Sequence, residues 1–199
     1  MCFTVAKEDS SRRADLLDKS IEYMLQKGVA DLSLRPLAAA VGSKARLLVY
    51  HFGSKESLIT DAMLVVRERV QQAFTEFVTD ERKQSPLEIV QAFWRWATSP
   101  AYERYLRLFF EVQGLALQKP SRYGRYLEGA TSSWVMMLAA VLPRKLSAPE
   151  RKALASLAVS TTFGLLLEFL SGGERKRVSR AFNLFLGSFE QLLSSEGRA

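Results

Sequence analysis

The sequence contains only one cysteine, Cys2, and only one histidine, His51. A single thiol cannot form an intramolecular disulfide, and these two residues are too few for the cysteine- and histidine-rich sets that hold zinc. One histidine also leaves Ser-His and Cys-His nucleophilic schemes with a single candidate base. We therefore expect no resident metal or cofactor and a reducing compartment, and we do not expect an enzyme.

Long apolar runs are also missing. The longest uninterrupted stretch, Trp134–Leu142, has nine residues, whereas a membrane-spanning helix needs about 20. The N-terminal segment becomes charged before an apolar signal-peptide region could form. The sequence predicts a cytoplasmic protein with no membrane partner.

The balance of charge is basic. The 199 residues include 28 Lys and Arg against 21 Asp and Glu, which gives a net charge of +7. Such an excess favours a polyanionic partner. Residues 1–60, however, hold 9 basic and 7 acidic side chains, so most of the excess lies in the later part of the chain.

The apolar pattern is helical. From Ile59 onward apolar residues recur at the three-and-four spacing of one helix face, and no sustained alternation of period two appears. Ser85 with Glu88, and Ser147 with Glu150, have the spacing of capping boxes that begin helices. An all-α fold of about nine helices follows. The expected helices span residues 10–27, 34–41, 45–51, 54–82, 86–98, 101–117, 121–142, 148–170 and 175–194, and the last few residues are expected to be a disordered tail.

Residues 33–55 contain four cationic side chains and no Asp or Glu. A short helix, a turn at Gly42 and a second short helix with small, basic and aromatic residues are typical of a DNA-binding helix-turn-helix. Gly42 supplies a positive φ at the turn, and Ala38 lets the two helices approach. Two alternatives remain at this point: a surface hairpin with solvated cations, or a strand over residues 47–52.

The same segment resembles the TetR family of bacterial transcriptional regulators. The matching residues, at the family's spacing and without a gap, are Gly28, Ser33, Arg35, Leu37-Ala38, Gly42, Leu48, Tyr50-His51-Phe52 and Lys55. Two departures stand out: Ser43-Lys44 replaces the usual Val-Ser, and Val49 replaces the first aromatic residue of a pair. The resemblance implies a DNA-binding domain over residues 1–54 and a helical ligand-binding and dimerisation domain over 55–199.

Roles at the DNA follow from side-chain chemistry. Lys44 and Arg46 suit guanine edges, Val49 suits a thymine methyl, and Lys55 suits a phosphate at a helix start. Ser33 is expected to cap its helix and to donate to phosphate, while His51 has a core or capping role as its alternative. The residues expected to contact DNA are Ser33, Arg35, Ser43, Lys44, Ala45, Arg46, Val49, Tyr50, His51 and Lys55. Arg12 and Arg13 either follow the DNA backbone or are solvated.

The middle of the chain is rich in aromatic residues. The resemblance implies that they line an inducer pocket, whereas plain core packing is the alternative. The residues expected to line it are Phe93, Trp94, Trp96, Tyr105, Phe109, Phe110, Trp134, Met137 and Phe163. Glu111, Gln113 and Glu168 lie near this set and are candidates to orient a ligand.

The last two helices carry apolar stripes that include Phe182 and Phe189. They are expected to form a homodimer interface, with intramolecular core as the alternative. The leading hypothesis is therefore a homodimeric repressor that leaves a palindromic double-stranded operator when a small apolar or amphipathic molecule binds. The alternatives are a regulator without a small-molecule inducer and an all-helical enzyme with a pocket in the bundle.

Overall fold

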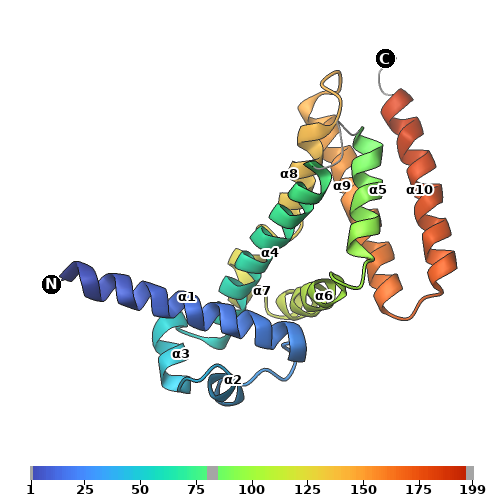
Figure 1. The fold of residues 1–199 in the computed structure, drawn as a ribbon. Helices are drawn as coiled ribbons and strands as arrows, with labels where there is room; N and C mark the ends of the chain where they lie inside the picture. The colour runs from blue at the N-terminus through green and yellow to red at the C-terminus, as the bar shows by residue number, and fades with distance from the viewer. Residues whose placement is uncertain (1, 80–84, 196–199) are drawn as a thin grey trace. The chain divides into compact units, whose positions relative to one another are not determined.

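The computed structural model describes residues 2–79 and 85–195. Over these ranges every regular element is an α-helix (Figure 1), which confirms the all-α prediction. Residues 47–52, for which a strand was the alternative, lie within a helix. The expected end of the fourth helix at residue 82 and the expected disordered tail fall outside the described residues.

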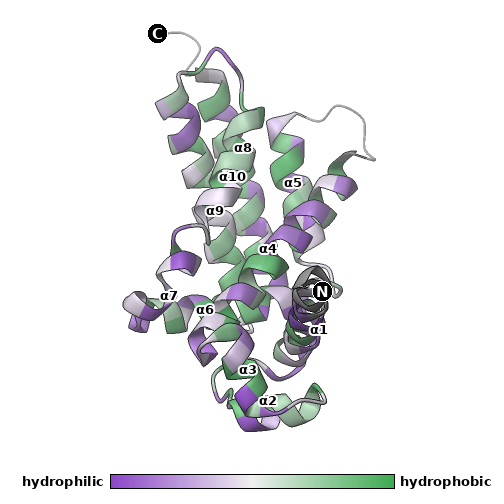
Figure 2. Cartoon of the chain, turned by 90° about the vertical axis from the view of Figure 1, so that its left-hand side faces the viewer, coloured by the Kyte–Doolittle hydropathy of each residue, from purple (hydrophilic) through white to green (hydrophobic). Residues whose placement is uncertain are grey.

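The chain divides into two compact units, and the first comprises residues 1–71 and 104–128. Its fully buried side chains include Met24, Leu37, Leu48 and Leu58. The short helices of this unit contain both hydrophilic and hydrophobic residues (Figure 2). The helices of this unit are α1 (Cys2–Lys27), α2 (Leu34–Ala40), α3 (Ala45–Phe52), the first part of α4 (Lys55–Thr79), α6 (Glu103–Gln118) and α7 (Pro120–Leu127).

The second unit comprises residues 72–103 and 129–199. Within it α9 packs against α8, α10 and α5, and α8 is hydrophobic along most of its length (Figure 2). The rings of Trp94 and Phe182 stack with centroids 4.4 Å apart, which joins α5 to α10. Its helices are the last part of α4, α5 (Pro86–Ala97), α8 (Ser132–Val141), α9 (Ala148–Leu170) and α10 (Arg175–Ser195).

Both predicted capping boxes are present. Ser85 caps α5 with Glu88, and Ser147 caps α9 with Glu150, each pair exchanging hydrogen bonds in both directions. These hydrogen bonds to Ser85 and Ser147 hold the pKa of Glu88 and the pKa of Glu150 below the ordinary value. Local sequence therefore determines where these two helices begin.

Two helix boundaries differ from the expected ones. The first helix begins at Cys2 rather than at residue 10, and the predicted helix 121–142 is interrupted between Leu127 and Ser132. Glycine has low helix propensity, and Gly129 lies in the interruption. The units also divide the chain differently from the expected 1–54 and 55–199, because α6, α7 and the start of α4 join the N-terminal helices.

Helix α9 is long and apolar enough to cross a membrane by length and composition alone. Its buried residues, among them Leu154, Ala158 and Leu166, belong to the core of the second unit, where α9 contacts three other helices. Only 33% of its apolar stretch is buried, so α9 packs one face against these helices and leaves the rest outward.

Candidate nucleic-acid interface

Helices α2 and α3 form a helix-turn-helix. Gly42 lies in the turn with φ of +67°, as the sequence predicts, and the Ser43 N–H donates to the Ala38 carbonyl at 2.8 Å. Ala38 is buried, and so are Leu37 and Leu48, which hold the two helices together. Only a residue that tolerates a positive φ fits the turn without strain, so Gly42 fixes the angle at which α3 leaves α2.

The outward face of α3 is exposed and cationic. Lys44 and Arg46 are exposed, as are Val49 and Tyr50, and Ala45 is half-buried. A surface hollow lies along this face, and no acidic side chain lines it in the part of the chain that the structure describes. It is lined by Arg12, Gly42, Ser43, Lys44, Arg46, Leu47 and Tyr50.

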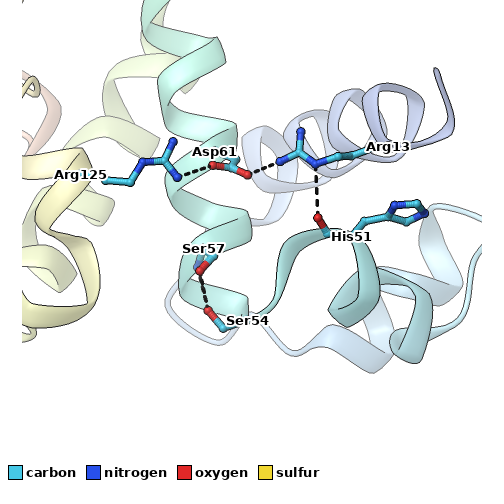
Figure 3. A network of polar contacts seen from close by, with 6 residues as sticks. All are labelled: Arg13, His51, Ser54, Ser57, Asp61 and Arg125. Carbon is cyan, nitrogen blue, oxygen red and sulfur yellow. Dashed lines mark hydrogen bonds and ion pairs between the residues drawn. The ribbon is translucent and has the colours of Figure 1, made fainter. Parts of the chain in front are cut away.

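Arg12 and Arg13 are adjacent in α1 but have different surroundings. Arg12 is exposed at the hollow beside α3. Arg13 forms an ion pair with Asp61 and donates from Nε to the His51 carbonyl at 3.3 Å (Figure 3), and its guanidinium lies 4.8 Å from the centre of the Phe52 ring. Arg13 therefore joins α1 to α3 and α4, whereas Arg12 adds a cation to the outward face.

The His51 side chain is only 2% exposed. Its Nδ1 lies 3.8 Å from the Asp9 carboxylate, and its Nε2 is buried with no hydrogen-bond partner among the described residues. The ring meets Phe52 edge-on, with centroids 6.3 Å apart. This environment favours the core alternative for His51 over contact with a phosphate.

Ser33 precedes α2 with an extended backbone. The prediction that Ser33 caps this helix is wrong, because the Ser33 side chain accepts no backbone N–H. A cap normally accepts from the second or third helical residue, and the third residue here is Pro36, which has no N–H. Ser33 and Arg35 are both exposed.

Lys55 begins α4, and its Nζ donates to the Leu32 carbonyl at 3.1 Å. An ammonium group has three N–H donors, so this contact leaves two for another acceptor. The neighbouring Ser54 accepts the Ser57 N–H at 3.0 Å and caps the helix (Figure 3). The start of α4 is thus held against the segment that leads into α2.

Helix α7 contacts α4 through two ion pairs that the sequence did not predict. Arg122 pairs with Glu56 at 3.1 Å. Arg125 pairs with Asp61 at 3.2 Å (Figure 3). Burial raises the pKa of Glu56, but backbone hydrogen bonding and Arg122 outweigh it and bring that pKa below its ordinary value. More than 60 residues separate the partners along the chain, so no local pattern signals these contacts.

The second unit contains a cavity of about 170 Å³. Its described lining is almost wholly apolar, and the hydroxyl-bearing side chains in that lining are those of Thr75 and Thr162. The lining residues are Phe74, Thr75, Val78, Ile89, Val90, Phe93, Trp134, Met137, Leu138, Val141, Ala158, Val159, Thr162 and Phe163. Four of the nine predicted pocket residues are among them: Phe93, Trp134, Met137 and Phe163.

The other five predicted pocket residues do not line this cavity. Trp94 is engaged with Phe182, and the Trp96 ring lies 3.8 Å from that of Tyr102. Tyr105, Phe109 and Phe110 belong to α6, in the first unit. Aromatic content alone does not distinguish cavity lining from core packing, because both remove the same apolar surface from water.

The polar residues expected near the pocket are used elsewhere. Glu111 accepts two backbone N–H groups of residues 29 and 30, and Glu168 forms an ion pair with Arg177. The amide oxygen of Gln113 is buried without a hydrogen-bond partner among the described residues. In the described ranges no group of three or more His, Cys, Asp and Glu residues could hold a metal ion.

Helices α9 and α10 each expose apolar residues. Leu157 and Leu167 on α9 are 45% and 47% exposed, and Leu184 on α10 is 70% exposed. Phe182 and Phe189, which the sequence placed in an interface stripe, are buried inside this chain. The core alternative therefore holds for these two residues, while another face of α10 is outward.

Known proteins match this chain in two ways, through a sequence profile over its N-terminal part and through the fold of most of the chain. Residues 16–62 match the profile of bacterial regulatory proteins of the tetR family. No curated protein sequence matches the chain. Among solved structures, a transcriptional regulator of Rhodococcus sp. Rha1 matches with a TM-score of 0.73 and 17% identity, over 90% of this chain and 96% of the other.

Two further solved structures have the same fold. A TetR-like transcriptional regulator of Rhodococcus sp. RHA1 has a TM-score of 0.60 and 16% identity, over 92% of this chain and 96% of its own. The multidrug binding protein EbrR, complexed with imidazole, has a TM-score of 0.68 and 19% identity, over 92% of this chain and 89% of its own. Residues 16–62 are thus similar to the N-terminal segment of tetR-family regulatory proteins, and the chain shares the fold of these solved structures.

Proposed function

We propose that the chain is a homodimeric repressor that binds a palindromic operator through α3 and leaves it when a small apolar molecule binds. The observation that carries this proposal is the cationic hollow beside α3. Arg12, Lys44 and Arg46 surround it, and none of the described residues that line it is acidic. A surface of this kind attracts phosphate and presents long donors to base edges.

Within this proposal the exposed residues divide by chemistry. Arg46 and Lys44 read guanine edges, and Val49 contacts a thymine methyl. Tyr50, Arg12 and Ser33 bind phosphate, together with the two Lys55 donors that the Leu32 carbonyl leaves unused. These phosphate contacts position the protein and carry no sequence information.

A palindromic operator needs two copies of α3 about one turn of DNA apart. The exposed apolar residues Leu157, Leu167 and Leu184 support an interface made by α9 and α10. Gly164 and Gly187 lie on these helices with nothing near the position of a Cβ, so they allow a second copy to approach closely.

The cavity supports a ligand without charge. Among the described residues no ionisable side chain lines it, and burying a charge without a partner is costly. A related fold, EbrR, has been crystallised with proflavin, which supports ligand binding as the means of release. We expect this chain to select compact, neutral, apolar or weakly amphipathic molecules.

The proposal is tested by measuring the affinity of the protein for the DNA upstream of its own gene. Affinity should fall steeply between about 50 and 200 mM salt, because phosphate contacts release counterions. Lys55→Ala should weaken binding to all sequences alike and lower the salt slope by about 1, whereas Arg46→Ala should relax preference at one base pair.

Lys145→Ala is the matched control, since Lys145 is an exposed cation of the second unit, and it should leave affinity unchanged. Binding without salt dependence would rule out the phosphate contacts. Equal, sequence-blind losses in Lys55→Ala and Arg46→Ala would contradict the division of roles.

A further inference from the structure

A carboxylate from α6 contacts the segment that joins α1 to α2. Oε1 of Glu111 accepts the Val29 N–H at 2.9 Å and the Ala30 N–H at 2.5 Å. The partners are 82 and 81 residues apart in the sequence. Hydrogen bonds to an ionised acceptor are stronger than neutral ones, so this contact fixes two consecutive peptide groups.

The backbone at residue 28 is shaped around that carboxylate. Gly28 has φ of +73°, and a Cβ there would lie 2.7 Å from Oε2 of Glu111. Its N–H donates to the Met24 carbonyl at 2.8 Å and closes the end of α1. A glycine is needed here for its positive φ and for the space that the carboxylate occupies.

A second contact holds the other end of the same segment. The Lys55 ammonium donates to the Leu32 carbonyl at 3.1 Å. An anion thus holds the N–H groups at the start of residues 28–33, and a cation holds a carbonyl near the end. This segment leads directly into α2, which packs against α3.

Helix α6 also contacts α1 through a residue that precedes Glu111 in the sequence. Arg104 pairs with Glu22 at 3.1 Å, and Arg104 lies seven residues, about two helical turns, before Glu111. Both side chains therefore project from the same face of α6. This exposed ion pair adds little stability and serves as an internal comparison for the Glu111 contact.

We propose that Glu111 is a positioning residue for DNA reading. It fixes the α1–α2 segment and thereby the place of α2 and α3, although it does not touch DNA itself. The inference rests on the proposed function for its binding readout, but the backbone contact itself is measurable without DNA.

The first experiment measures amide hydrogen exchange by NMR in the free protein. Glu111→Ala should speed exchange at Val29 and Ala30 by about tenfold or more, because both N–H groups lose a charged acceptor. Glu111→Gln keeps an acceptor oxygen and should give a smaller change, and Arg104→Ala should leave both amides unchanged. Unchanged exchange at Val29 and Ala30 in Glu111→Ala would overturn the proposal.

The second experiment measures affinity for the upstream DNA, at a temperature where every variant is fully folded. We expect a loss of about tenfold for Glu111→Ala, a smaller loss for Glu111→Gln, and a loss within about twofold for Arg104→Ala. A folded Glu111→Ala protein with wild-type affinity would refute the positioning role. Failure of the wild-type protein to bind any upstream DNA would instead refute the proposed function, with the exchange result still deciding the contact.

If Glu111→Ala does not fold, the contact between residue 28 and Glu111 is tested by thermal denaturation. Gly28→Ala is made in three backgrounds: wild type, Glu111→Gln and Glu111→Ser. The φ strain of Gly28→Ala is the same in every background, but its clash with the carboxyl group is not. Gly28→Ala should therefore be more destabilising in wild type and Glu111→Gln, whose side chains reach residue 28 with a group of the same size, than in Glu111→Ser, whose side chain is too short. Equal costs in all three backgrounds would overturn the proposal.

Discussion

Tyr50 and His51 are neighbours in α3 whose rings meet edge-on, with centroids 5.0 Å apart at 75°, yet Tyr50 is 71% exposed while the His51 side chain is 2% exposed. Their substitution should separate binding from stability. Tyr50→Ala should weaken DNA binding by about tenfold, the value of one hydrogen bond to a charged group, and should change the free energy of unfolding by less than about 0.5 kcal/mol. Fluorescence anisotropy and urea denaturation measure the two quantities.

The converse is expected for the buried neighbour. His51→Ala should lower the free energy of unfolding by about 1–3 kcal/mol, because it empties a buried site. Its DNA affinity, measured where it is folded, should fall less than that of Tyr50→Ala. A stable His51→Ala protein with a specific loss of DNA affinity would restore the phosphate role for His51.

The sequence predicts what depends on local chemistry. Helix starts at Ser85 and Ser147, the turn at Gly42 and the outward cations Lys44 and Arg46 all follow from neighbouring residue types. Pro36 removes one of the two N–H groups that Ser33 could have capped.

What the sequence could not predict depends on contacts between distant residues. Glu111 reads as a free carboxylate until its backbone partners 82 residues away are known. Trp94 and Trp134 are alike as residue types, but one stacks on Phe182 and the other lines the cavity. Such assignments require the packing of whole helices.

Asp61 accepts hydrogen bonds from Arg13 of α1 and Arg125 of α7, and its side chain is 15% exposed (Figure 3). Asp61→Asn should lower the free energy of unfolding by about 1 kcal/mol, because two partly exposed guanidinium groups lose their charged acceptor. Urea denaturation checks this value. The control is Asp15→Asn, which disrupts an exposed pair with Lys19 and should cost less than about 0.5 kcal/mol; equal costs would show that the Asp61 contacts add nothing.

Tyr126 is 3% exposed, and its hydroxyl has no hydrogen-bond partner among the described residues. Tyr126→Phe should therefore leave stability at neutral pH unchanged or raise it by up to about 1 kcal/mol. Burial raises the pKa of the Tyr126 hydroxyl above its ordinary value of 10.0.

The sign of the alkaline effect follows from proton counting. Above about pH 10 the unfolded chain has released the Tyr126 proton while the folded protein retains it, so the free energy of unfolding falls as pH rises. Urea denaturation at several pH values from 8 to 11 should show a shallower fall for Tyr126→Phe than for wild type. Tyr123, whose pKa is also raised by burial, should leave part of the fall in place, and identical slopes would contradict the prediction.

Ala158 is 1% exposed and lines the cavity of about 170 Å³. Ala158→Leu should occupy part of that space and weaken binding of a neutral apolar probe such as naphthalene by about tenfold or more, since the ligand and the new side chain compete for one volume. Isothermal titration calorimetry measures the affinity. Ala140→Leu adds the same atoms at an exposed position of α8 and should leave the affinity for the probe unchanged. An equal loss of affinity in both variants would place the probe outside the cavity.

Leu184 on α10 is 70% exposed, more than any other large hydrophobic residue of that helix. If α9 and α10 form the dimer interface, Leu184→Arg places a charge in that interface on each copy and removes apolar contact area. Sedimentation equilibrium should show a dimer dissociation constant raised by at least about a hundredfold, and operator binding should lose its dependence on paired half-sites. Met136→Arg is the control, because Met136 is 68% exposed on α8, outside the proposed interface. Dimerisation that survives Leu184→Arg but is lost in Met136→Arg would move the interface to α8.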